Sequence, residues 1–527
     1  MKSRCPLTLD PAPQQGRLLY DSAAVMACTF VACWLAFRGL WHGLDGYQLL
    51  SDIHNGSLFH DRHVLYKPIA WMCDRSLQWL GTREFESVVA ASMIFTSIGV
   101  AFAHRALLNL SLTRRAAATA AAAIASCFCI LYFGTVIEFH GVFFGFTGLA
   151  WWCFAKFLRS PSWHSAILAG IGSGLSAAAH ATGQLLPFVF FAFTLAWSPQ
   201  ISAALHTRAW PSWLARFALM FAAHFATAAT VTSLLLLLTS SGDAALKTGI
   251  FEGPRSFVSN YLAMQTVWGT APALFVQEWL MPFLPLSLLP LCALLVPRLR
   301  LEGALFGCCL LVYLLATTVL LSPFTTLSHP QYLPQYTLIE YGAYFMPLVF
   351  PAAVLLIRLL PSRLHFAMVL ATLAVSAIGF ARPDRPARND AFGNAVLQII
   401  DERHGTVLCG GYAELDSVQR LRPMLDPQHF LPVFALQMQV FNILTDKVHP
   451  TDSEKIYPFV TTIFDALFGI TIARSGPMFV TDDALRLLLA TKDGYLDRLV
   501  TEHIAQKYQL APCCIGPMGG QEVTRKP

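Results

Sequence analysis

The chain has 527 residues, of which 55% are hydrophobic and 13% are charged, and its mean hydropathy is +0.53. An ordinary soluble domain carries roughly 25% charged residues, so this composition excludes a soluble globular protein and predicts an integral membrane protein. The net charge of +5 is explained by basic cytoplasmic loops that orient a multi-pass chain, and it therefore gives no indication of nucleic-acid binding.

Apolar stretches follow one another along the chain, most of them close to the about 17–25 residues that a helix needs to cross a bilayer core. They lie at residues 22–40, 86–105, 116–134, 139–157, 164–179, 182–197, 214–238, 272–296, 303–321, 339–358 and 364–381. Counting 164–179 and 182–197 as two crossings keeps the later Lys- and Arg-rich loops on the cytoplasmic side. The sequence therefore predicts an α-helical polytopic protein with about eleven transmembrane helices, a cytoplasmic N-terminus (residues 1–21) and a transmembrane domain (residues 22–381).

The first predicted extracytoplasmic loop, residues 41–85, is rich in polar side chains. These are Asp45, Asp52, His54, His60, Asp61, His63, Tyr66 and Lys67. A carboxylate such as Asp45 at the membrane surface can act as a general base on a hydroxyl group, or it can hold a divalent cation (Mg²⁺ or Mn²⁺) against a phosphate. A solvated loop without chemistry is the alternative. Apolar spacing in residues 68–81 also predicts a helix that lies flat in the membrane interface.

A single carboxylate stands out further along the chain. Between Arg115 and Lys156 the only charged residue is Glu138, at a predicted tight extracytoplasmic turn. A lone carboxylate in so apolar a stretch costs free energy unless it is paired or hydrated. Glu138 would either stabilise the N-terminus of a helix or face a cavity shared with Asp45. Its neighbour His140 is expected to be an ordinary interface histidine.

A second polar pair, His180 and Gln184, lies in a stretch without Asp, Glu, Lys or Arg between Arg159 and Arg208. Small residues just before it permit close approach of helices. His180 is predicted on the same side of the membrane as Asp45 and Glu138. These two residues would either form a hydrogen bond between helices or contact a substrate.

The later loops 241–271 and 322–338 lie on the predicted extracytoplasmic side as well. They and the start of the next span supply Lys247, Arg255, Glu340 and Tyr341. Such cationic and hydrogen-bonding groups suit a lipid-borne phosphate at headgroup level, although ordinary hydrated loop residues look the same. No CxxC spacing occurs, so we predict no structural metal cluster.

The tail from residue 382 to residue 527 carries charged residues at an ordinary frequency. The stretches TVLCGG and GPMFVT are typical of short strands, and helices are expected near 391–402 and 482–499. Strands that alternate with helices favour an α/β class. We therefore predict a small α/β domain over residues 382–527 on the extracytoplasmic side.

These residues together resemble the multi-pass GT-C glycosyltransferases, in particular the protein O-mannosyltransferase-like branch, over roughly residues 20–380. The matching positions are Asp45 for an early loop Asp, His63, Tyr66 and Pro68 for a His–Tyr–Pro element, Glu138 for a turn Glu, and His180 for a later His. The stretch EYGAYFMPLVFP, residues 340–351, also looks like a late span-opening segment of such proteins. One departure is RHVLYKP where the branch often has His-Pro-Pro-Gly, and it leaves the sugar open.

The resemblance implies inverting transfer of a sugar from a polyprenyl-phosphate donor to an acceptor, at the extracytoplasmic face of a bacterial inner or plasma membrane. The implied catalytic residues are Asp45, as general base or metal ligand, Glu138, and Asp52 as an alternative to Asp45. Together with the polar residues selected above, the predicted substrate-binding residues are His63, Tyr66, His180, Gln184, Lys247, Arg255, Glu340 and Tyr341. Either a divalent cation or Lys and Arg side chains would stabilise the departing phosphate, and no other cofactor is expected.

A transporter or flippase for a lipid-linked or small polar substrate is the main alternative. A transport path needs polar groups at the middle of the membrane and usually two related halves. The polar groups here gather on one side and the sequence has no internal repeat, so transfer at the membrane surface is favoured. A scaffold without catalytic activity is the third hypothesis, and it gives Glu138 no role.

Overall fold

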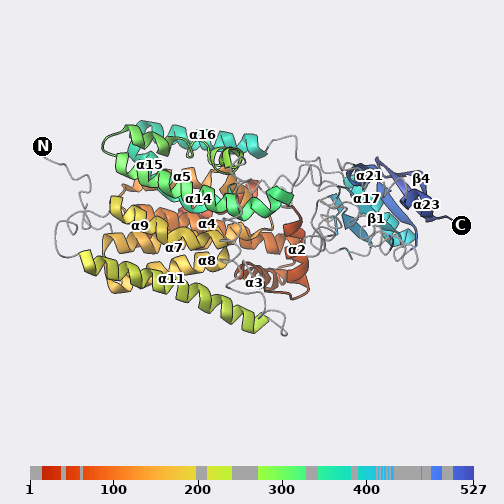
Figure 1. The fold of residues 1–527 in the computed structure, drawn as a ribbon, viewed down its shortest axis with the longest axis horizontal. Coiled ribbons are helices and arrows are strands. Elements are labelled where there is room, and N and C mark those ends of the chain that lie inside the picture. Colours follow the sequence, from red (N-terminus) through yellow and green to blue (C-terminus); the bar gives the residue numbers. More distant parts are fainter. Residues whose placement is uncertain are drawn as a thin grey trace. The chain divides into compact units, whose positions relative to one another are not determined.

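The computed structural model describes two compact units, residues 1–325 with 338–381 and residues 326–337 with 382–527. Within them, the described residues are 15–36, 43–59, 63–82, 84–197, 210–239, 271–327, 342–380, 390–410, 414, 417–418, 421–422, 425, 429–432, 465, 476–489 and 503–526. Figure 1 shows the helices and strands of both units, coloured along the sequence.

The N-terminal unit is built from helices (Figure 1). In chain order they are α1 (Gln15–Ala36), α2 (Gly43–His54), α3 (Tyr66–Gln78), α4 (Glu84–Asn109), α5 (Arg114–Ala125), α6 (Phe128–Phe133), α7 (Phe139–Arg159), α8 (Trp163–Ala179), η1 (Ala181–Leu185), α9 (Leu186–Trp197), α11 (Trp210–Thr239), α13 (Ala271–Leu274), η4 (Phe275–Leu280), η5 (Leu289–Leu295), α14 (Arg300–Leu327), η6 (Ala343–Phe345), α15 (Met346–Leu359) and α16 (Ser362–Phe380). In the described part of the loop predicted at residues 41–85 lie α2, α3 and the start of α4, and α3 covers most of the predicted interfacial segment.

Six helices among the described residues are long and apolar enough to cross a membrane. They are Leu19–Ala36, Glu86–Asn109, Phe139–Arg159, Pro211–Leu238, Arg300–Thr318 and Ser362–Phe380. Two shorter apolar helices lie at Ala181–Trp197 and Ala343–Leu359. The protein is therefore an integral membrane protein, and the count of about eleven spans stays a prediction.

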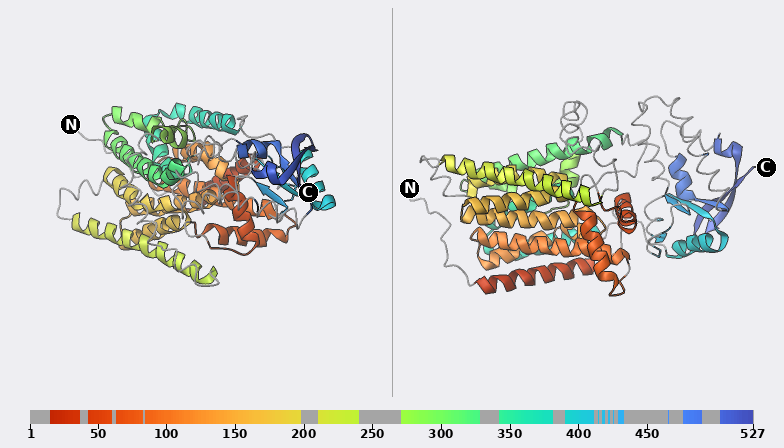
Figure 2. Two further views of the ribbon diagram at one scale, coloured as in Figure 1. Left: turned by 45° about the vertical axis from the view of Figure 1, so that its right-hand side comes forward. Right: turned by 90° about the horizontal axis from the view of Figure 1, so that it is seen from below.

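Helices α4, α7, α8 and α11 run side by side in Figures 1 and 2, with α4 packed on α7, α7 on α8, and α8 on α11. Glycines permit this close approach. A Cβ atom on Gly148 of α7 would lie 2.3 Å from the backbone oxygen of Gly99, and one on Gly174 of α8 would lie 2.5 Å from that of His224. The small residues before His180 therefore serve helix packing, as the sequence predicts.

The substitution Gly148→Ala is expected to force α4 and α7 apart. Overpacking of this kind costs about 1–3 kcal/mol, so the thermal unfolding midpoint of the purified protein in detergent should fall by several degrees. Gly307→Ala on α14 is the matched control, because a Cβ atom there meets nothing within 4 Å. An equal midpoint for the two variants would contradict this account of the packing.

The predicted spans 116–134 and 272–296 differ from regular helices within their length. The stretch 116–134 is broken at Cys127, which has an extended backbone (φ −62°, ψ 138°) between α5 and α6. The stretch 272–296 consists of α13, the π-helix η4, a run of turns and the 3-10 helix η5. It contains Pro282, Pro285 and Pro290, whose missing N–H groups and rings disfavour a continuous α-helix.

The C-terminal unit contains a five-stranded sheet in the order β2-β1-β3-β5-β4. The strands are β1 (Thr406–Cys409), β2 (Phe430–Pro432), β3 (Met478–Thr481), β4 (Tyr508–Ile515) and β5 (Met518–Arg525), and the described helices are α17 (Asp390–Arg403), α21 (Asp482–Leu489) and α23 (Ala505–Lys507). Strand β1 pairs in parallel with β2 and β3, whereas β5 is antiparallel to β3 and β4. Strands β1 and β3 coincide with the stretches TVLCGG and GPMFVT, and both are fully buried.

Candidate functional site

Glu138 lies at the turn before α7 and is completely buried. Its extended backbone (φ −162°, ψ 149°) ends the turn, and its Oε1 atom accepts a hydrogen bond of 2.8 Å from the N–H of Phe139. The carboxylate therefore caps the positive end of the α7 dipole, which is one of the two roles considered for it. His140 Nδ1 lies 3.7 Å from the same oxygen, so an imidazole borders the carboxylate as well.

The segment that begins α3 brings two of the predicted residues to this turn. The His63 ring stacks on Phe139, with 3.5 Å between ring centroids and 11° between planes. Tyr66 is fully buried. Burial and, after it, the charge of Glu138 raise the pKa of Tyr66 well above its ordinary range, so its hydroxyl stays protonated at neutral pH.

His180 joins the same group of side chains from the end of α8. Its ring centroid lies 4.8 Å from that of His63 and 5.0 Å from that of His140. The N–H of Thr182 donates to His180 Nδ1 over 3.2 Å, so in the neutral ring the proton is on Nε2. Tyr344, at the start of the late apolar segment, lies 5.3 Å from His180 between ring centroids.

We name this group the histidine cluster, defined as His63, Tyr66, Glu138, His140, His180 and Tyr344. It joins four segments that are far apart in the sequence. Ser92 of α4 donates to the backbone oxygen of Glu138 (3.3 Å), and a Cβ atom on Gly141 would lie 3.0 Å from Ser92 Cα. The first turn of α7 thus packs directly on α4 and holds Glu138 in place.

Two residues of this region were missed from the sequence. His140, expected to be an ordinary interface histidine, is fully buried within the cluster; its position two residues after Glu138 was the available signal. Glu278 in η4 is also fully buried, and its Oε2 accepts a 2.8 Å hydrogen bond from the N–H of Gly342. Gly342 adopts a left-handed backbone (φ 90°), so Glu278 fixes the turn that leads into Tyr344.

Other predicted residues lie apart from the cluster. Gln184 Oε1 lies 3.0 Å from His224 Nε2, so this side chain links η1 to α11. Asp52 on α2 is held by Lys67, whose Nζ lies 2.6 Å from Asp52 Oδ2 and also donates to the Phe59 carbonyl over 3.1 Å. Lys67 is buried, so this carboxylate neutralises a cation that would otherwise be costly to bury.

For the remaining predicted residues, the structure does not describe the side chains. Asp45 lies in the first turn of α2, and its side chain is outside the described part of the structure. Lys247, Arg255, Glu340 and Tyr341 lie outside the described residues. Their assigned roles stay predictions.

A divalent cation on Asp45 was one of the possibilities that the sequence left open. Among the described residues no group of three or more His, Cys, Asp or Glu side chains could hold a metal ion. The rings of His63 and His180 stack, those of His140 and His180 are tilted by 45°, and the carboxylate of Asp52 is paired with Lys67. A divalent cation therefore stays a prediction that involves Asp45, whose side chain lies outside the described part of the structure.

The chain is similar in structure to several solved membrane proteins. One is ArnT from Cupriavidus metallidurans bound to undecaprenyl phosphate, with 12% identity, 97% of this chain and 98% of that chain covered, and a TM-score of 0.49. Another is the oligosaccharyltransferase AglB from Archaeoglobus fulgidus in complex with an inhibitory peptide and a dolichol-phosphate, with 11% identity, 95% and 74% covered, and a TM-score of 0.45.

A further Archaeoglobus fulgidus oligosaccharyltransferase structure, a complex with Zn and sulfate, matches with 10% identity, 94% and 72% covered, and a TM-score of 0.43. No family model matches the chain, and no curated protein matches its sequence. Since these three TM-scores lie below 0.5, the roles of residues in this chain rest on its own contacts. The narrower prediction, the protein O-mannosyltransferase-like branch, stays a prediction.

Proposed function

We propose that the protein is a GT-C-type glycosyltransferase, which moves a sugar from a polyprenyl-phosphate donor to an acceptor at the extracytoplasmic face. The observation that carries this proposal is the histidine cluster. His63, Tyr66, Glu138 and His180 were selected from the sequence as parts of one site, and their side chains come together from three separate segments. Independent packing roles would not require them to meet.

Burial makes a purely structural role for Glu138 costly. Ser, Thr, Asp and Asn are the preferred residues at a helix N-cap, and Glu is not among them. A fully buried carboxylate needs several hydrogen-bonding partners to offset its lost hydration. A carboxylate that acts on substrate explains why this costly group stands at a position where a hydroxyl would cap the helix.

The proposed reaction is a single displacement. The acceptor hydroxyl oxygen attacks the anomeric carbon of the donor, the bond from that carbon to the phosphate oxygen breaks, and the hydroxyl proton passes to Asp45. Glu138 accepts a hydrogen bond from a sugar or acceptor hydroxyl, while Tyr66 and the Nε2–H of His180 donate hydrogen bonds. Fixed donors in a dry site stabilise developing charge more strongly than water does.

The proposed arrangement has about eleven transmembrane helices, a cytoplasmic N-terminus and an extracytoplasmic domain from residue 382 in a bacterial plasma membrane. It puts the loop 41–85 and the turn at Glu138 at the same membrane surface. Donor phosphates lie at headgroup level, so a site at that surface meets the phosphate without moving it across the bilayer.

A donor screen tests the proposal. Purified protein in nanodiscs would be incubated with a panel of radiolabelled polyprenyl-phosphate sugars, with and without Mg²⁺ or Mn²⁺. We expect one donor to be consumed, and we expect the Glu86→Gln variant, which changes an exposed carboxylate on α4, to behave like wild type. If the folded protein consumes no donor in the panel but moves a lipid-linked sugar between leaflets, the proposal is wrong and a flippase is favoured.

A further inference from the structure

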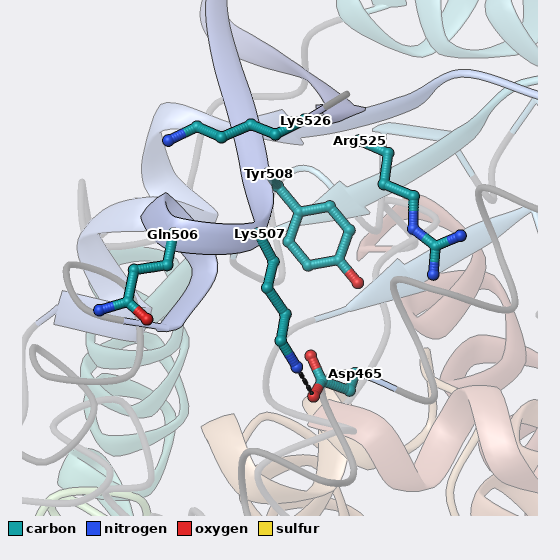
Figure 3. A pocket seen from close by; sticks show the side chains of 6 residues that line it. All are labelled: Asp465, Gln506, Lys507, Tyr508, Arg525 and Lys526. Carbon is teal, nitrogen blue, oxygen red and sulfur yellow. Dashed lines mark hydrogen bonds and ion pairs between the residues drawn. The ribbon is translucent and has the colours of Figure 1, made fainter.

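The C-terminal unit contains a pocket of about 510 Å³ at the open end of the β4–β5 hairpin. Figure 3 shows the six side chains that line it: Asp465, Gln506, Lys507, Tyr508, Arg525 and Lys526. Pockets that bind small molecules commonly measure about 300–1,000 Å³. Its volume therefore suits a ligand of the size of a sugar phosphate.

Backbone pairing fixes the walls of the pocket. Tyr508 of β4 and Arg525 of β5 are directly opposite one another in the antiparallel register. The N–H of Lys526 donates to the carbonyl of Lys507 over 3.0 Å, which extends the pairing by one step beyond the strands. Four of the lining residues thus start from one rigid ladder, and binding would require little reordering of the backbone.

Three of the described lining residues, Lys507, Arg525 and Lys526, are cationic, and Asp465 is the one carboxylate among them. Asp465 Oδ2 lies 2.5 Å from Lys507 Nζ (Figure 3). His503 Nε2 lies 2.8 Å from the other oxygen of Asp465. Among the described residues Arg525 makes no ion pair. Its planar guanidinium suits a phosphate or carboxylate, which it can bind through two parallel hydrogen bonds.

Tyr508 adds an aromatic ring and a hydroxyl between these charges. The residue is 4% exposed. Burial and, after it, the charge of Asp465 raise the pKa of Tyr508, whereas Arg525 and Lys507 counteract the rise. Tyr508 is therefore a neutral hydrogen-bond donor at physiological pH and shares one electrostatic environment with the three charged side chains.

We propose that this pocket binds an anionic saccharide, with the phosphate or carboxylate group on Arg525 and with sugar hydroxyls on the neighbouring Tyr508 and Lys507. This inference concerns the C-terminal unit alone and does not rest on the proposed transferase activity. Binding of this kind would give the unit a recognition role for a charged glycan.

The test is calorimetric titration of the full-length protein in phosphatidylcholine nanodiscs with glucose 1-phosphate. We expect saturable binding that weakens as salt is added, because the charged side chains are exposed. Arg525→Gln should weaken it about tenfold, the effect of losing one charge-assisted contact. Arg422→Gln removes the same charge from an exposed ion pair with Asp401 outside the pocket, and it should bind as wild type does.

Three results would overturn the proposal. Equal binding by wild type and Arg525→Gln would remove the pocket as the site. If glucose or inorganic phosphate bound as tightly as glucose 1-phosphate, the site would not be selective for an anionic saccharide. Loss of binding when the nanodiscs contain phosphatidylglycerol would identify a lipid headgroup as the occupant instead. Melting curves for each variant, expected to match wild type, show that a loss of binding is not a loss of fold.

Discussion

Glu138→Gln is expected to lower the rate of sugar transfer by about 100-fold or more, within the range that a positioned acid or base contributes. The amide oxygen can still accept the hydrogen bond from the N–H of Phe139 that the carboxylate accepts now. The helix cap is therefore retained, and the melting midpoint should change by only a few degrees. The measurement is initial rate under saturating donor, together with a melting curve.

The control is Glu86→Gln, an exposed position on α4 that loses the same charge. If Glu138 only caps α7, Glu138→Gln will keep nearly full activity, and activity will decline only in variants that also unfold more easily, such as Glu138→Ala. That pattern would leave Glu138 with a structural role and remove it from the reaction.

Asp45→Asn is expected to reduce transfer by about 1,000-fold while expression and membrane insertion are unchanged, because loss of a general base costs about 10²–10⁴-fold in rate. Asn has the shape of Asp but cannot accept the proton of the acceptor hydroxyl. The measurement is the single-turnover rate with donor and acceptor both bound, which separates the chemical step from product release.

Asp52→Asn distinguishes the two candidate bases on α2. The carboxylate of Asp52 already pairs with buried Lys67, so we expect its substitution to affect the stability of the α2–α3 segment more than the chemical step. Asp21→Asn on α1, which removes a half-buried carboxylate that pairs with Arg114, serves as the control for charge loss. A larger loss of rate in Asp52→Asn than in Asp45→Asn would reverse the assignment.

Many helix positions can be predicted from the sequence because they depend on local composition. Helix α7 begins at Phe139, where a span was predicted to begin, and α8 ends just before His180. Both ends follow from where apolar runs meet polar or turn-forming residues. The irregular segment at 272–296 was missed, although prolines within it, Pro282, Pro285 and Pro290, were the signal that a regular helix would not form.

The β4–β5 hairpin was not predicted for a related reason. Its strands contain Pro512, Gly519 and Gly520, which are depleted in strands. Hydrogen bonding along the whole ladder from Tyr508–Arg525 to Ile515–Met518 outweighs these local preferences. Gly516, with φ of 61°, forms the turn between them.

The sequence predicted which residues belong to the site, but it did not predict which of their side chains contact one another. Glu138 was noticeable because it is alone in an apolar stretch, and His180 for the same reason. Which side chains meet depends on contacts between His63, Phe139 and His180 over separations of tens of residues, and no local pattern encodes such contacts. Gln184 is an example: it lies four residues after His180 in the sequence, and yet its side chain contacts His224. Closeness in sequence therefore did not predict its partner.

The most direct test of transfer at the histidine cluster follows both products of one turnover in nanodiscs: the released polyprenyl phosphate and the sugar on its acceptor, including its anomeric configuration. We predict equal amounts of the two products, an inverted anomeric centre, and loss of both products in Asp45→Asn and Glu138→Gln but not in Glu86→Gln. Movement of intact sugar-linked lipid across the membrane without release of polyprenyl phosphate would contradict the account.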